Sequence, residues 1–359
     1  MTILRSSRSG AADPDACREV LLTQAVSAYH EVAPPGVDLN PVRTDLLCRV
    51  ACLHSLGRTH VGYDDLVVLA GYATSFAYHP TLFSVMYQPP DSPEETERRV
   101  VAAIGYGWEW LPRAADSEVA WQAVRDTLDS GRPVQARWLD DYVFAGYRDA
   151  THRTNRGVHS LGGWSEPGWM PWTAFDEWCK DSWRLGRPTA PVPQTPTEEL
   201  VPALLRRMVE WSQGDGRADV DWMREGVFGN PGILAYADDV ADAARPPERF
   251  DPGWLCCHCV NRQSSGRASA ARWLRRQAPL LTESVRACLC EAADFYDKAC
   301  EAWLAFRAAL GPEGGKDAVT EAWRDAASRA RGAICLRRAA GYEREAAGKL
   351  AQAVEALGA

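Results

Sequence analysis

The first half of the chain has hydrophobic residues at three- and four-residue steps, the spacing of helices that bury one face. The strongest case is residues 44–57, where Thr44 is a suitable N-cap and Gly57 a suitable stop. The same spacing predicts helices over residues 16–32, 62–71, 94–104 and 116–130.

The hydrophobic period changes after the last of these helices. Residues 133–138 alternate apolar and polar positions, which predicts a strand. Residues 158–164 and 169–172 predict two strands of a hairpin around the turn at residues 165–168. A helix over residues 173–183 follows, so the first half has an α+β pattern.

A proline- and threonine-rich stretch, residues 186–198, predicts an extended linker. The sequence therefore predicts an α+β domain over residues 1–185, the linker, and an all-helical domain over residues 199–359. Helical periodicity in that second domain covers residues 199–212, 231–244, 266–277, 282–309, 316–331 and 333–357.

Composition narrows the class of protein. The 359 residues suit about two domains, and a net charge of −8 disfavours a role in nucleic-acid binding. No apolar run is long enough to cross a membrane, and the N-terminal residues lack the apolar core of a secretory signal. We therefore expect a cytoplasmic protein with no membrane or nucleic-acid partner, whose 11 cysteines are thiols.

One cysteine and one histidine have positions that suit nucleophilic catalysis. Cys48 lies four residues after Thr44, near a helix N-terminus, where partial positive charge lowers a thiol pKa. His159 opens a predicted strand and would supply the base. Each residue also has a plain structural interpretation, because cysteine and histidine are common in cores.

Four stretches carry a resemblance to a known family. They are residues 48–53 (CRVACL), 69–80 (LAGYATSFAYHP), 131–142 (GRPVQARWLDDY) and 158–164 (VHSLGGW). In this order and spacing, residues 44–183 resemble the butirosin biosynthesis acyltransferase family, a papain-like group. The helical half resembles the uncharacterised helical domain that commonly follows it.

The resemblance implies a papain-like fold and acyl transfer in natural-product (antibiotic) biosynthesis. Cys48 would take an acyl group from a thioester, with an acyl carrier protein as donor, and His159 would act as the base. A small-molecule amine or hydroxyl would accept the group, and an acceptor within the same substrate would make the enzyme a cyclase. The Cys48 amide is the implied donor to the oxyanion, and no cofactor is expected.

Two alternatives stay open. The strand at residues 169–173 has no carboxylate or amide to orient His159, and Glu166 and Asp176 are the substitutes to consider. Without such a residue, the chain would be a papain-like binding or scaffold protein with no catalytic activity. With water as the acceptor, it would be a thioesterase or amide hydrolase.

A Cys/His cluster at residues 256–259 could begin a zinc site. The nearest second pair, Cys288 and Cys290, lies in a predicted helix at a spacing that points the two thiols apart. We therefore expect no metal.

Two further groups have competing interpretations. Five tryptophans either pack the sheet against its helices or line an acyl pocket beside His159. An arginine-rich stretch, residues 262–276, is either a solvated helix face or a docking surface for an acidic carrier protein. The tryptophans are Trp164, Trp169, Trp172, Trp178 and Trp183.

Overall fold

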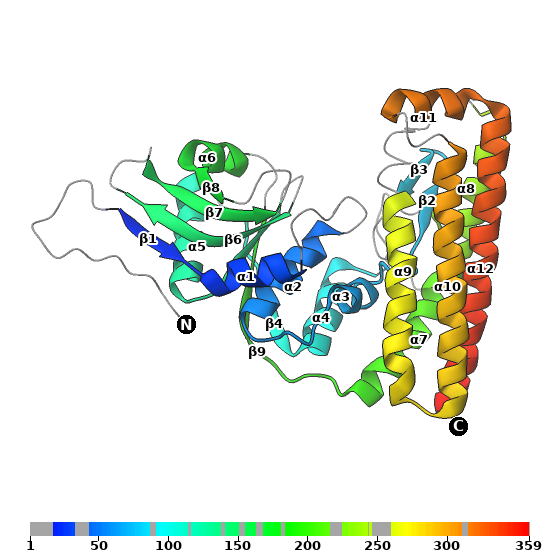
Figure 1. Cartoon of the computed structure of the whole chain (residues 1–359), viewed down its shortest axis with the longest axis horizontal. Helices are drawn as coiled ribbons and strands as arrows, with labels where there is room; N and C mark the ends of the chain where they lie inside the picture. The colour runs from blue at the N-terminus through cyan, green and yellow to red at the C-terminus, as the bar shows by residue number, and fades with distance from the viewer. Residues whose placement is uncertain are drawn as a thin grey trace, which may run out of the picture. The chain divides into compact units, whose positions relative to one another are not determined.

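A computed structural model of the chain has a mixed α+β fold with antiparallel sheets (Figure 1). It describes residues 17–32, 43–86, 91–113, 116–137, 141–150, 155–162, 168–180, 184–215, 225–242, 244–245, 260–310 and 315–358. Within these ranges, no helix combines the length and apolar character needed to span a membrane.

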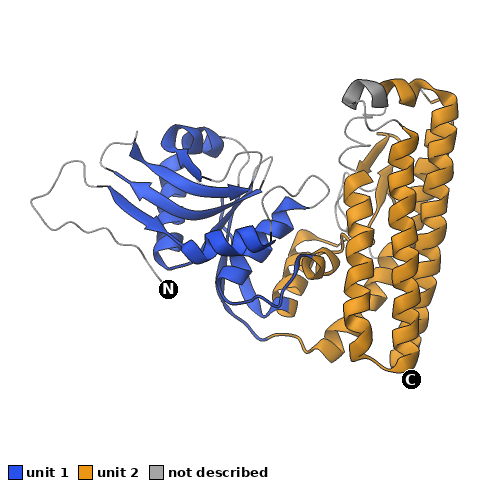
Figure 2. Ribbon diagram, in the orientation of Figure 1, with its two compact units in different colours: residues 1–39, 43–63, 104–193 blue, residues 40–42, 64–103, 194–359 orange. Residues whose placement is uncertain are grey.

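The chain divides into two compact units (Figure 2). Unit 1 comprises residues 1–39, 43–63 and 104–193, and unit 2 comprises residues 40–42, 64–103 and 194–359. This division differs from the predicted domains, because residues 64–103 belong with the helical half. Phe76 and Tyr78 are buried in one apolar cluster with Ile233 and Trp303, a packing that periodicity along the chain does not show.

Unit 1 is built around an antiparallel sheet in the order β4-β9-β5-β6-β7-β8, with β1 also paired to β6. Helices α1 and α2 pack on one face of this sheet, and α5 and α6 cover the other (Figure 1). The strands are β1 (Arg18–Leu21), β4 (Tyr106–Trp110), β5 (Val134–Arg137), β6 (Asp141–Asp149), β7 (Gly157–Gly162), β8 (Gly168–Pro171) and β9 (Arg184–Pro191). The helices are α1 (Thr23–Val32), α2 (Thr44–Ser55), α5 (Ser117–Asp129) and α6 (Trp172–Lys180).

Two segments of unit 1 differ from the sequence prediction. Residues 18–21 form strand β1, where a helix from residue 16 was predicted, because they pair with β6. Residues 186–191 of the predicted linker belong to β9, which pairs with both β4 and β5. Gly186 is required there, since a Cβ would lie 2.8 Å from the Trp108 indole nitrogen.

Unit 2 combines a helical bundle with a small antiparallel sheet of order β10-β2-β3. Its strands are β2 (Ala77–His79), β3 (Ser84–Met86) and β10 (Val227–Phe228). Its helices are α3 (Tyr63–Leu69), α4 (Pro93–Ile104), α7 (Thr197–Gln213), α8 (Gly229–Ala241), α9 (Val260–Gln277), α10 (Glu283–Ala309), α11 (Gly315–Arg324) and α12 (Ala326–Gly358), with a 3₁₀ turn over Ala278–Leu280. Helix α12 starts earlier than predicted, because Asp325 accepts hydrogen bonds from the Ser328 backbone and hydroxyl.

A buried arginine connects α12 to the end of α8. The Arg329 guanidinium donates to the backbone oxygens of Val240 at 2.8 Å, Asp242 at 2.5 Å and Arg245 at 3.1 Å. Helix C-termini leave carbonyls without partners inside the helix. Arg329 therefore satisfies the C-terminal end of α8 from a distant part of the sequence.

Candidate functional site

Cys48 is the fifth residue of α2, and its side chain is only 1% exposed. The helix begins at Thr44, but its N-cap is Arg43 and not the predicted Thr44, and the Leu47 amide already donates to the Arg43 oxygen at 3.1 Å. The Cys48 amide is one residue further along the same helical ladder. The expectation that this amide serves as an oxyanion donor therefore does not fit the structure.

Tyr29 of α1 interacts electrostatically with Cys48. Burial, and then the charge of Cys48, raise the pKa of this tyrosine. Gly162, at the end of β7, has a φ of +96°, and a Cβ there would lie 2.9 Å from both the Tyr29 hydroxyl and the Asp141 backbone oxygen. Tyr29, Gly162 and the start of β6 are thus packed together.

His159 lies on β7, between Gly146 of β6 and Trp169 of β8. Its ring meets Trp169 edge to face, with centroids 5.2 Å apart. Burial, and then the charge of Arg148, lower the His159 pKa, whereas the charge of Glu19 opposes this effect. The imidazole is therefore neutral at physiological pH and can accept a proton.

Two adjacent residues of α1 interact electrostatically with Cys48 and with His159. The charge of Cys48 acts on Tyr29, and the charge of the adjacent His30 lowers the pKa of His159. His159 faces the α1 side of the sheet because its neighbour Val158 pairs with Tyr147, whose ring packs on Trp121 of α5. The imidazole therefore lies on the face of the sheet that α1 and α2 cover.

Of the two residues proposed to orient His159, one lies on the opposite face of the sheet and the other lies outside the described residues. Asp176 accepts a hydrogen bond from the Ser117 hydroxyl at 2.5 Å and pairs with Lys180, on the opposite face of the sheet. Glu166 lies outside the described residues. Glu19 is the carboxylate whose charge acts on His159, and the sequence prediction missed it because residues 18–21 were assigned to a helix.

A second cluster of polar side chains surrounds the N-terminus of α2, and the sequence analysis did not identify this cluster as a site. Arg43 donates to both carboxylate oxygens of Asp45, at 3.0 and 2.9 Å. Asp141 accepts a hydrogen bond from Thr44 at 3.4 Å, and Arg137 lies 3.9 Å from its other oxygen. Burial, and then the charge of Asp45, raise the Asp141 pKa from 3.8 to about 7.

This raised pKa predicts a pH-dependent stability. The folded chain keeps a proton on Asp141 that the unfolded chain releases near pH 4, so the stabilisation is complete below about pH 4 and is lost as pH rises to about 7. Asp141→Asn should remove this dependence and raise the free energy of unfolding at pH 8 by a few kcal/mol. Chemical denaturation across pH 4–8 measures the free energy of unfolding of each variant, with the exposed Asp126→Asn as the control. If Asp141→Asn showed the same pH dependence as the wild type, the prediction would be wrong.

The described cysteines are free thiols, and the described residues contain no His, Cys, Asp or Glu group suited to a metal. The Cys/His cluster at residues 256–259 lies outside the described residues. Cys52, one turn from Cys48, is fully buried, and burial raises its pKa, so it is not an activated nucleophile.

The tryptophans divide between packing and the site. Trp172 packs edge to face on Trp121, and Trp178 on Phe144, both on the face of the sheet away from His159. Trp169 lies beside His159, with the Arg148 guanidinium 3.9 Å above its ring. Trp164 and Trp183 lie outside the described residues.

The arginines of residues 262–276 form ion pairs within unit 2. Arg272 and Arg276 contact Asp64 at 2.7 and 3.1 Å, and Arg275 contacts Asp294 at 2.7 Å. Much of the charge proposed for docking an acidic partner is therefore balanced inside the unit.

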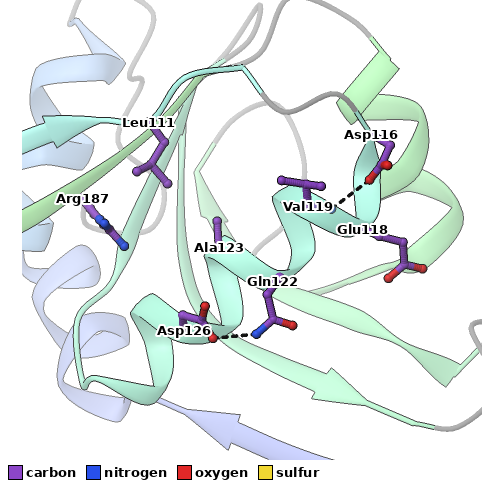
Figure 3. A pocket seen from close by; sticks show the side chains of 8 residues that line it. All are labelled: Leu111, Asp116, Glu118, Val119, Gln122, Ala123, Asp126 and Arg187. Atoms are coloured by element: carbon purple, nitrogen blue, oxygen red, sulfur yellow. Dashed lines mark hydrogen bonds between the residues drawn. The ribbon is translucent and has the colours of Figure 1, made fainter.

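A surface depression of about 530 Å³ lies along α5 (Figure 3). Asp116, Glu118, Val119 and Arg187 are among its lining residues, and Asp116 caps the helix by accepting from the Val119 amide. Because α5 covers the face of the sheet away from His159, this depression does not serve the thiol.

Comparison with known proteins adds no assignment: no protein-family model matches the chain, and no curated protein is similar to it. The functional inference therefore depends on the arrangement of Cys48, His159 and their neighbours.

Proposed function

We propose that unit 1 is a papain-like acyltransferase in which Cys48 carries the acyl group and His159 moves the proton. The observation that carries this proposal is that His159 faces the side of the sheet covered by α1 and by α2, the helix in which Cys48 is buried. The lowered pKa of His159 supports its role as a base, because a neutral imidazole can take the thiol proton.

The reaction has two balanced steps. His159 takes the proton from Cys48, the thiolate attacks a thioester carbonyl, and the departing thiolate receives the proton from His159. An amine or hydroxyl then attacks the acyl-Cys48 thioester, gives its proton to His159, and leaves with the acyl group as Cys48 recovers its proton. The chemistry needs no cofactor, because the thiol and the imidazole supply it.

A carrier-protein thioester is the proposed donor, in cytoplasmic natural-product biosynthesis, and a small-molecule amine or hydroxyl is the proposed acceptor. An acceptor within the acyl chain would close a ring, and water would hydrolyse the thioester. The acceptor that Trp169 and its neighbours admit beside His159 therefore decides between transferase, cyclase and hydrolase.

Intact-mass measurement after mixing the full chain with a panel of acyl-carrier thioesters tests the proposal. The wild type should gain the mass of one acyl group, and Cys48→Ala should not. His159→Gln should slow adduct formation by about 10²–10⁴-fold. Cys52→Ala, a buried thiol one turn away, is the matched control and should keep the adduct.

Binding without catalysis is a second candidate function, favoured by the 1% exposure of Cys48 and by the place of its amide in the helix. A carrier protein would then bind to the chain, and no thioester of the panel would add an acyl group to the chain. An adduct that persists in Cys48→Ala would overturn the nucleophile assignment.

A further inference from the structure

We infer that Arg148 of β6 is a positioning residue for His159: its guanidinium holds the Trp169 ring, and the Trp169 ring holds the imidazole. Glu19 of β1 in turn holds the guanidinium. The inference rests on the proposed function for its chemical meaning, because a base must keep one ring orientation to take and return a proton. It gives the orienting task to a stack of side chains, since residues 168–171 contain no carboxylate or amide side chain.

The strand register places these side chains on one face of the sheet. Glu19 is paired with Arg148 across β1 and β6, and His159 is paired with Trp169 across β7 and β8. The residue of β6 opposite His159 is Gly146, two positions before Arg148. Paired residues share a face, and so do residues two apart in a strand. All four side chains therefore point to the face of the sheet on which α1 packs.

A glycine lets the guanidinium cross from β6 to β8. Strand β7 lies between these strands, and its residue opposite Arg148 is Gly157. Because Gly157 has no side chain, Arg148 can reach over β7, and its guanidinium carbon lies 3.9 Å from the centre of the Trp169 ring. A guanidinium is flat and stacks on aromatic faces, whereas a lysine ammonium is a compact point charge. The contact therefore connects β6 to the side chain that borders His159.

The Trp169 ring borders the imidazole. The two rings meet edge to face at 84°, with centroids 5.2 Å apart, an arrangement that aromatic pairs prefer. The Nδ1 atom of His159 is buried and has no hydrogen-bond partner within the described residues. Among these residues, the orientation of the ring therefore depends on packing against Trp169 rather than on a hydrogen bond at Nδ1.

The guanidinium is itself fixed by Glu19. The Arg148 Nε donates to Glu19 at 2.8 Å, and the two side chains are 41% and 43% exposed. An ion pair this exposed adds little stability by itself, so its main effect is to fix the plane of the guanidinium. Burial lowers the His159 pKa, Arg148 on β6 and His30 on α1 lower it further, and Glu19 on β1 opposes them. The stack therefore also brings a balanced pair of charges to the imidazole.

NMR of the full chain, with its histidine rings labelled with carbon-13, tests the contact without any substrate. His159→Gln identifies the His159 signal among the seven histidines. The wild type should show a cross-peak between the His159 and Trp169 rings. Arg148→Gln should weaken this cross-peak and raise the His159 pKa, because both the stack and a nearby positive charge are lost. Glu19→Gln should lower that pKa, because a nearby negative charge is lost.

Arg148→Lys separates the stack from the charge. It should leave the His159 pKa near its wild-type value and still weaken the cross-peak, because the ammonium has no plane to place on the ring. With the N-acetylcysteamine thioester of acetate as the probe, it should slow acylation of Cys48 by about 10²-fold. The thioester concentration that gives half the maximal rate should not change, because Arg148 acts through His159 and not on the substrate.

Arg184→Lys is the matched control. Arg184 is exposed, and its guanidinium lies 5.3 Å from the centre of the Trp110 ring, so the same change is made at another arginine–tryptophan pair of unit 1. This variant should keep the wild-type cross-peak, His159 pKa and acylation rate. Melting curves confirm that each variant folds.

An unchanged cross-peak in both Arg148→Gln and Arg148→Lys would overturn the inference. A lower melting temperature with an unchanged cross-peak would do the same, since it would show that Arg148 only stabilises the sheet. The NMR readout is independent of acyl transfer. A weakened cross-peak in a chain that no thioester acylates would therefore reject the proposed function and leave the placement of the ring by Arg148 in force.

Discussion

Glu343→Ala is expected to lower the free energy of unfolding by about 3–5 kcal/mol, the usual effect of removing one partner from a buried ion pair. Glu343 is 1% exposed, and it accepts hydrogen bonds from Arg267 at 2.9 and 2.8 Å. The indole nitrogen of Trp303 donates to the same carboxylate at 3.1 Å.

The size of the effect comes from the group that remains. The Arg267 side chain is fully buried, and it also donates to the Ser75 backbone oxygen at 3.3 Å. Without Glu343, its charge stays in a site that water does not reach. Arg267 lies on α9, Glu343 on α12 and Trp303 on α10, so the loss affects three helices of unit 2 at once.

Denaturant unfolding of the variant and of two controls measures this effect. Glu345→Ala, at an exposed position of the same helix, should change the free energy by less than about 0.5 kcal/mol. The double variant Arg267→Met with Glu343→Leu should recover most of the loss, because no buried charge remains. A Glu343→Ala effect no larger than that of Glu345→Ala would contradict the prediction.

Gly229→Ala should destabilise unit 2 by about 3 kcal/mol. Gly229 begins α8 with a φ of +60°, a backbone conformation that strains an L-residue with a side chain. A Cβ would lie 2.4 Å from the Ser212 oxygen, and 2.6 Å from the Gly214 nitrogen and the Trp211 oxygen. All three atoms belong to the backbone, so no side-chain rotation can relieve the contact.

Gly341→Ala is the matched substitution with the opposite expected sign. Gly341 lies inside α12, and a Cβ there has nothing within 4 Å. Alanine in a helix interior should therefore stabilise the chain by about 0.5–1 kcal/mol. Thermal melts of both variants measure the difference. A similar effect of the two substitutions would show that the space around each glycine does not govern its stability.

Local patterns were sufficient for several elements of the fold. The α2 pattern succeeded because its apolar spacing, its start at Thr44 and its stop at Gly57, with a φ of +82°, agree with one another. The hairpin of β7 and β8 was also predicted, since the two strands are close in sequence. Strands β1 and β9 were missed because their assignment depends on partners at least 47 residues away, the separation of Arg137 and Arg184.

Only part of the candidate site could be predicted from the sequence, as with the fold. Sequence could place Cys48 on a helix and His159 on a strand, because both assignments are local. It could not find Asp141 as a titrating group, because its raised pKa depends on burial and on Asp45, 96 residues earlier. The exposure of the thiol also depends on tertiary packing, and only the structure gives it.

Unit 2 is built from separate stretches of the chain, and this has a consequence for its folding during synthesis on the ribosome. Residues 64–103 emerge before all of unit 1 is made, yet their partners begin at residue 194. At typical elongation rates, these residues wait roughly 5–20 s for the first of those partners. Unit 1 is complete once β9 has emerged, so it can fold while Phe76 and Tyr78 still lack the bundle that buries them. The nascent chain therefore has an interval in which this apolar segment depends on chaperones, or on rapid elongation, to avoid aggregation.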